Sequence, residues 1–203
     1  MKRFLLAALL LVSVPFAKAG AGNYPHISYG FEWGYTGTFL RSWQYNYICN
    51  EGFRIVDSDE VWRYFSNGTF LVNAGVDLAD KLNLSVYSGL SGVYFRRWMI
   101  PLEARARFCP SGLDHTGFIC YMGAGAMLPV SVLRNANFGA KIGAGYRVSV
   151  FRTISVDFLL SAHFTTDHDR ITDPDTKQYV PAADITKNAS QYTALCISAA
   201  INF

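Results

Sequence analysis

The chain has 203 residues, with 18 Lys or Arg and 15 Asp or Glu. Three of the basic residues lie in the first 19 positions, so 18 − 3 leaves 15 basic against 15 acidic side chains in residues 20–203. This neutral balance gives no support for nucleic-acid binding. The four cysteines are too few for a disulfide scaffold, and none form the C-x-x-C pair of common zinc sites.

Residues 1–19 have the pattern of a signal peptide. The chain starts with basic Lys2-Arg3, continues with a mostly apolar run at 4–16, and then has a small-x-small site at Ala17-Lys18-Ala19. The apolar run is shorter than the roughly 20 residues that a membrane helix needs. We therefore expect a cleaved signal peptide at 1–19 and one exported domain at 20–203.

The rest of the chain repeats one pattern, in which apolar residues alternate with small or polar ones. A period of two indicates half-buried β-strands. Pro101 near the start of the fourth predicted strand favours a bulge or an unpaired residue there, and the fifth strand is apolar or small on both faces, so its inward face stays open. The eight predicted strands are 27–39, 69–78, 82–95, 99–108, 117–128, 137–148, 153–164 and 191–203.

The connections alternate in length. Two are long, at 41–67 and 165–190, whereas those at 79–81, 109–116 and 151–152 are short. Long loops at one end and tight turns at the other are typical of outer-membrane β-barrels.

The distribution of glycine indicates which face lies inside. In a soluble β-barrel the bulky residues fill the interior and a well-charged face meets water. Here the polar face carries few charges and many glycines, which suits a crowded lumen, and aromatic residues gather near the strand ends. The pattern therefore favours a membrane barrel with its apolar face outward. The glycines on the polar face are Gly30, Gly34, Gly75, Gly89, Gly139, Gly143 and Gly145.

The last predicted strand ends on Ile201 and Phe203. It resembles the terminal strand of bacterial outer-membrane barrels, and residues 20–203 as a whole resemble the small OmpA-like and OmpW-like barrels. The resemblance implies an all-β, eight-stranded antiparallel up-and-down transmembrane barrel in a Gram-negative outer membrane. It also implies that outer-membrane lipid surrounds the barrel and that the barrel-assembly machinery reads Ile201 and Phe203. It implies no cofactor and provides no functional motif to carry over.

If the apolar face meets lipid, the charged residues of the other face point into a bore that side chains nearly fill. They should then pair with one another as a network that closes the barrel. A narrow conduit or a small-ligand site is the alternative interpretation. The predicted luminal residues are Glu32, Asp77, Glu103, Arg105, Arg107, Lys141, Arg147, Asp157 and His163.

The strongest catalytic candidates are Asp157, Ser161 and His163, which share one strand face. Outer-membrane lipid A deacylases carry a His-x-Ser pair on a barrel strand. Here the order is Ser-x-His, the face points inward, and no oxyanion hole is visible. We expect a packed luminal histidine and no enzyme activity; a lipid-modifying hydrolase is a remote alternative.

Two loops and one cysteine pair complete the expectations. The acidic loop 165–190 lacks the calcium-binding loop pattern and is predicted to be solvated, with no metal. The aromatic loop 41–67 either packs over the barrel mouth or forms an interaction surface. Cys109 and Cys120 flank one turn and could pair, but register cannot be fixed from sequence.

The predicted function is therefore a structural or surface-interaction role through long loops on a filled barrel. The alternative is a conduit or binder for a small polar or hydrophobic ligand.

Overall fold

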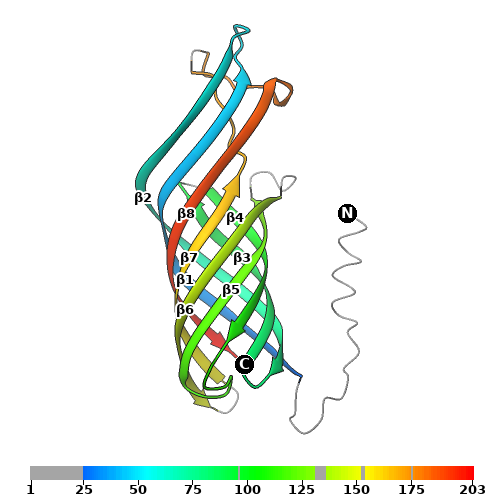
Figure 1. Cartoon of the computed structure of the whole chain (residues 1–203), viewed down its shortest axis with the longest axis vertical. Coiled ribbons are helices and arrows are strands. Elements are labelled where there is room, and N and C mark those ends of the chain that lie inside the picture. Colours follow the sequence, from blue (N-terminus) through cyan, green and yellow to red (C-terminus); the bar gives the residue numbers. More distant parts are fainter. Residues whose placement is uncertain (1–24, 96, 131–135, 152–153, 175) are drawn as a thin grey trace.

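The computed structural model describes residues 25–95, 97–130, 136–151, 154–174 and 176–203. The predicted signal peptide at 1–19 lies outside the described residues. Eight antiparallel strands form a closed barrel in the order β1 to β8 (Figure 1). This confirms the predicted all-β up-and-down architecture. The strands are β1 (His26–Ile48), β2 (Arg54–Ala79), β3 (Leu82–Tyr94), β4 (Arg97–Phe108), β5 (Gly117–Pro129), β6 (Asn137–Phe151), β7 (Ile154–Asp167) and β8 (Ile185–Asn202).

The described residues contain one short helical element, the 3-10 helix η1 (Ala182–Asp184). No helix in the described ranges is long and apolar enough to cross a membrane.

The first connection is much shorter than predicted. β1 and β2 have 23 and 26 residues and leave only residues 49–53 between them, so a long loop at 41–67 is wrong. The pairing of β1 shifts between Thr38 and Leu40 against both β2 and β8. Such an irregularity moves the inward side chains from one parity to the other, which breaks the alternation that sequence analysis follows.

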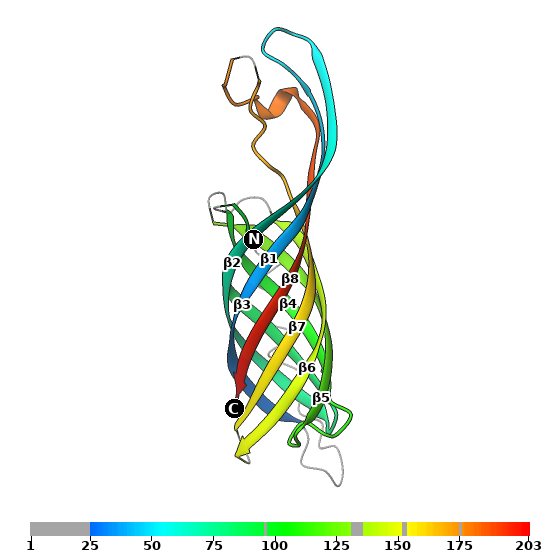
Figure 2. The same cartoon turned by 90° about the vertical axis from the view of Figure 1, so that its left-hand side faces the viewer.

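The upper parts of β1, β2 and β8 continue beyond the barrel as a three-stranded sheet, which we call the extension (Figures 1 and 2). Below the shift, Thr36 and Thr38 of β1 are buried; above it, Tyr47 is buried instead. The connection between β7 and β8 lies against the extension, where Tyr47 and Cys49 form a buried cluster with Ile171 and Val180. We call residues 168–184 the final loop.

The barrel wall is apolar on the outside and charged on the inside. Phe158 and Ile197, for example, expose 57% and 69% of their surface, whereas Arg105 and Asp157 are fully buried. This distribution is that of a transmembrane barrel, and it confirms the predicted fold class. The exposed apolar side chains of the wall include Ile27, Tyr29, Phe70, Val72, Leu84, Val86, Leu102, Phe118, Met122, Ile142, Phe158, Leu160, Leu195 and Ile197.

The face of β5 that the sequence left open is now clear. Ile119 and Tyr121 are buried, whereas Phe118 and Met122 are exposed on the wall. Odd-numbered residues of β5 therefore point into the lumen.

Luminal glycines leave room for large side chains of neighbouring strands. An added Cβ at Gly143 would lie 2.5 Å from Cζ of Tyr121, and one at Gly139 would lie 2.6 Å from Cγ of Met127. A side chain at either position would displace its neighbour. The glycine-rich faces of the strands therefore line the lumen, and large side chains of the neighbouring strands fill the space that the glycines leave.

Two smaller expectations concern Pro101 and the cysteines. Pro101 pairs with Met127 in regular register, and its side towards β3 has no paired residue. All four cysteines are free. Cys109 lies in a buried cluster with Leu113 and Ile119, whereas Cys120 pairs with Phe108 on the outward face. The two cysteines therefore face opposite sides, and the considered disulfide is absent.

Candidate functional site

The middle of the lumen is organised around Arg105, which is fully buried. Its Nη1 lies 2.6 Å from Oε2 of Glu32, and its Nε lies 2.9 Å from Oε1 of Glu103. Lys141 Nζ lies 2.9 Å from the other oxygen of Glu103, and the Ser198 hydroxyl donates to Oε1 of Glu32 at 3.0 Å. Two cations and two carboxylates thus form one balanced cluster.

Two aromatic rings enclose the same guanidinium group. Cζ of Arg105 lies 3.6 Å from the centre of the Tyr87 ring and 4.8 Å from that of Tyr121. Such cation–π contacts stabilise a desolvated cation. Arg105 therefore has ionic partners at its edge and aromatic partners on its flat surface.

A second cluster lies nearer the end of the barrel where the tight turns are, and it centres on Asp157. Arg147 donates to both carboxylate oxygens, at 2.7 and 2.8 Å, which is the strong bidentate arrangement. Arg107 and Asn202 donate to the same carboxylate at 3.2 and 2.9 Å. Arg107 also donates to the Tyr87 hydroxyl, so Tyr87 connects the two clusters.

Seven of the nine predicted luminal residues belong to two ion-paired clusters, and two lie outside them. Glu32, Glu103, Arg105 and Lys141 form the middle cluster, and Arg107, Arg147 and Asp157 form the second. Asp77 accepts a hydrogen bond from Asn83 at 2.7 Å and has no ion pair among the described residues. His163 hydrogen-bonds to Ser161.

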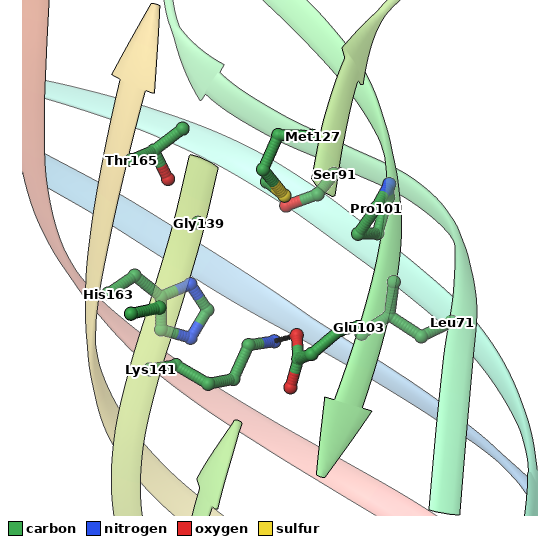
Figure 3. A pocket seen from close by; sticks show the side chains of 10 residues that line it. Leu71, Ser91, Pro101, Glu103, Met127, Gly139, Lys141, His163 and Thr165 are labelled. Atoms are coloured by element: carbon green, nitrogen blue, oxygen red, sulfur yellow. Dashed lines mark ion pairs between the residues drawn. The ribbon is translucent and has the colours of Figure 1, made fainter. Parts of the chain in front are cut away.

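The three catalytic candidates do not form a triad. Ser161 Oγ lies 2.8 Å from Nε2 of His163, but the Asp157 carboxylate is held by Arg107 and Arg147. His163 lines a luminal cavity of about 20 Å³ together with Lys141 and Glu103 (Figure 3). This volume holds about one water molecule. The geometry is that of a packed histidine with a neighbouring hydroxyl.

The turn between β4 and β5 reaches into the barrel opening at the same end as the Asp157 cluster. Leu113 is buried against Cys109 and Ile119, and its carbonyl accepts a hydrogen bond from Nη1 of Arg147 at 2.7 Å. The backbone N–H of Leu113 donates to the Asp80 carbonyl of the β2–β3 turn at 2.7 Å. The turn thus covers part of the lumen next to the Asp157 cluster, beside a cavity of about 310 Å³ that Arg107, Arg147 and Asn202 also line.

The opposite opening is crossed by a group that we call the mouth cluster: Arg41, Arg97, Asp167 and Asp169. Oδ2 of Asp169 lies 2.9 Å from Nη2 of Arg41, and Oδ1 lies 2.7 Å from Nη1 of Arg97. Arg97 also pairs with Asp167. These contacts join β1, β4 and the start of the final loop.

Hydroxyl groups strengthen the same contact. Ser190 and Tyr192 donate to Oδ2 of Asp169 at 2.7 and 2.8 Å. Burial by itself raises the pKa of Asp169, but the hydrogen bonds from Ser190 and Tyr192 and the charges of Arg97 and Arg41 outweigh it, so the pKa lies below its ordinary value of 3.8. The carboxylate is therefore ionised at neutral pH and ties the final loop to the barrel.

The prediction of a solvated acidic loop is thus wrong for three of its aspartates, although residues 176–179 are exposed. Asp167, Asp169 and Asp173 are buried, and they are satisfied by protein groups; Asp173 accepts from the backbone N–H of Asn50 at 2.9 Å. Asp175 lies outside the described residues. Within the described ranges, no group of three or more His, Cys, Asp or Glu side chains is placed to hold a metal ion.

Sequence reasoning missed the mouth cluster as a unit. Arg41 and Asp169 are 128 residues apart. The sequence of the final loop also has no regular alternation that would predict which of its side chains face the barrel. The face of Arg41 also depends on the irregularity between Thr38 and Leu40. An unbroken alternation from the lower part of β1 would have assigned Arg41 to the outside.

The chain is similar to solved outer-membrane proteins. The AlkL structure determined by solid-state NMR in DMPC lipid bilayers has 9% identity and a TM-score of 0.49, covering 92% of this chain and 95% of that one. OprG from Pseudomonas aeruginosa has 9% identity and a TM-score of 0.44, covering 89% and 97%. The outer membrane protease OmpT from Escherichia coli has 7% identity and a TM-score of 0.42, covering 92% and 99%. No protein-family model and no curated protein matches the chain.

Proposed function

We propose that the protein is a bacterial outer-membrane barrel with a closed lumen that acts at the cell surface through its extension. The exposed apolar wall supports the membrane location. Aromatic side chains flank this wall, with Trp33, Tyr35 and Trp98 towards the extension and Tyr146 and Phe151 towards the turns, all exposed. In this orientation the extension stands outside the cell and the tight turns lie in the periplasm.

The observation that carries the proposal is the series of side-chain layers along the lumen. The mouth cluster, the Arg105 cluster, the Asp157 cluster and the turn at Leu113 follow one another from end to end. Buried ion pairs with several hydrogen bonds are costly to break. The layers favour a rigid scaffold over a conduit, and the extension is then the part available to partners.

Planar-bilayer conductance tests the closed lumen. The purified full chain should insert and give no steady current, because Arg105 and its buried partners Glu32 and Glu103 occupy the middle of the bore. The absence of current is interpretable when the same refolded sample shows the gel shift of an intact barrel. A reproducible open level would overturn the closed-lumen proposal and favour the alternative, a conduit for a small polar solute.

The interactions that accompany this function are part of the proposal. Outer-membrane lipid surrounds the wall, and the barrel-assembly machinery recognises β8 through Ile201 and Phe203. In support, the Phe203 ring stacks on Tyr29 at 5.5 Å, and the two backbones exchange hydrogen bonds of 2.8 and 3.2 Å where the barrel closes. We propose a non-enzymatic role, because Asp157 is separated from the Ser161–His163 pair by its own arginine contacts.

A further inference from the structure

Residues 54–64 of β2 have a neighbouring strand on one side only, whereas from Phe65 on the end of β3 lies alongside, with the Phe65 and Tyr94 rings 4.4 Å apart. β1 pairs with this stretch from Ile48↔Arg54 onward, whereas β3 begins to pair with β2 only at Thr69↔Ser91. Within the described ranges, no other backbone pairs with residues 54–64. Figures 1 and 2 show this part of β2 standing beyond the barrel at the side of the extension. It is a free ladder edge.

The sequence of this edge lacks two devices that usually block strand pairing. Natural edge strands often carry proline or lysine; residues 54–64 contain neither, and their basic residues are Arg54 and Arg63. The other side of the extension is different, because the side-chain amide of Asn188 on β8 donates to the Asp169 carbonyl of the final loop at 2.6 Å. The extension is thus covered by its own chain at β8 and left open at β2.

The middle of the edge carries three exposed carboxylates, Asp57, Asp59 and Glu60. Asp57 accepts from the Trp43 indole at 2.9 Å and Glu60 from the Trp62 indole at 3.1 Å. Oδ1 of Asp59 accepts the backbone N–H of Glu60 at 2.7 Å. None of the three has an ion pair among the described residues, so their charges are available to a cationic partner.

The two faces of the edge differ in character. Asp57 and Asp59 share one face with Ile55, because alternate residues of a strand point the same way. The opposite face presents Val56 and Trp62, which are 72% and 69% exposed. A strand laid against this edge would therefore meet Asp57 and Asp59 on one face, and on the other Val56 and Trp62 with Glu60 between them.

We propose that the β2 edge binds an extended polypeptide segment by strand addition, with basic side chains facing Asp57 and Asp59 and apolar or aromatic ones facing Val56 and Trp62. Main-chain hydrogen bonds supply affinity in this mode, and alternate side chains supply specificity. A second copy whose acidic stretch lies opposite this one fits less well, because like charges then face each other. The inference rests on the proposed surface role and adds the class of partner.

The test uses the full chain in lipid nanodiscs and a synthetic peptide of about nine residues, in which lysine alternates with valine and threonine. The matched peptide has glutamate in place of lysine. Two further peptides are N-methylated, one at every lysine and one at every valine and threonine. Alternate N–H groups of a strand point to opposite edges, so strand addition predicts that one methylated form loses binding and the other keeps it.

The basic peptide should bind, the glutamate peptide should not, and amide exchange in residues 54–62 should slow on binding. Absence of binding by the basic peptide overturns the proposal. Equal binding of both methylated peptides also overturns it, because attraction by side-chain charge alone would not depend on which peptide edge is methylated.

A variant tests the acidic residues. The substitutions D57N, D59N and E60Q keep hydrogen-bond acceptors and should weaken binding about tenfold, since each opposite-charge pair contributes modestly. A control with E51Q and D184N neutralises carboxylates away from the edge and should bind as the parent does. Equal weakening in both variants would contradict the assignment. The heat-modified gel shift and the conductance of these variants test the closed-barrel proposal separately. A result against the closed barrel can therefore be distinguished from a result against peptide binding at the β2 edge.

Discussion

Arg105 shows how one buried charge holds the lumen together. Its guanidinium touches two carboxylates and two tyrosine rings that come from four different strands, counting its own. Alternation along β4 predicted that Arg105 points inward, because residues of one parity share a face. It could not predict the partner, because Glu32 is 73 residues away and the choice among inward carboxylates depends on how the closed barrel staggers its strands.

Replacing Arg105 should therefore destabilise the barrel strongly. R105M leaves the carboxylates of Glu32 and Glu103 buried without their main cation, a change that typically costs about 3–5 kcal/mol. The free energy of unfolding in urea, measured with the protein in lipid vesicles, should fall by this order, and the heat-modified gel shift should occur at lower temperature. The double variant R105M/E32Q should recover part of the loss. An unchanged R105M melting profile would show that the network contributes little.

Asp169 makes a pH-dependent contact at the mouth. Its folded pKa lies below the ordinary 3.8, so the ionised form stabilises the closed loop at neutral pH. This contribution is present above pH 3.8 and is lost as the pH falls through the lower folded pKa. Pepsin cleavage of the final loop should consequently rise below about pH 3.8, while the barrel stays intact on a gel. D169N should show faster cleavage already at higher pH. If the rise in cleavage on acidification is lost in this variant, Asp169 is the group whose titration causes it.

At the scale of elements, the sequence predicted the strands inside the wall well and the extension poorly. Within the membrane every second residue must be apolar, so the alternation of β3, β4, β6 and β7 is regular and the limits of β3 to β7 are nearly right; β5 is apolar or small on both faces, and only its limits were predicted. Above the wall, water meets the outer face and no such requirement exists. Asp57, Ser58 and Asp59 therefore suggested a loop, although they are paired with β1 throughout. The mouth contacts were missed because the final loop has no repeat.

The final loop should depend on its small apolar cluster. I171D places a charge among Tyr47, Cys49 and Val180, and a buried unpaired carboxylate is strongly unfavourable. Exchange of backbone amides in residues 168–184 should quicken while exchange in the barrel strands stays slow. V56D, an exposed change on the same extension, is the control and should leave the loop protected. Equal exchange in I171D and the parent would mean that the cluster does not hold the loop.

On the scale of the whole molecule, the proposed closure of the lumen depends on several side-chain layers in series. Removing the mouth cluster with R41A, R97A and D169A should leave bilayers silent, because the Arg105 and Asp157 clusters still fill the bore below it. The same variant should bind cysteine reagents faster at Cys49 or Cys196 if the mouth has opened, which provides the positive readout. A steady current in this variant would show that the mouth cluster alone keeps ions out.

The irregularity between Thr38 and Leu40 separates two hydrophobic phases along a single strand. Below it, alternate side chains of β1 point to the lipid and to the lumen. Above it, the alternation resumes in the opposite phase, so that Arg41, Tyr45 and Tyr47 face the protein side. The extension can consequently differ in length or sequence without altering the alternation of inward and outward residues in the barrel wall.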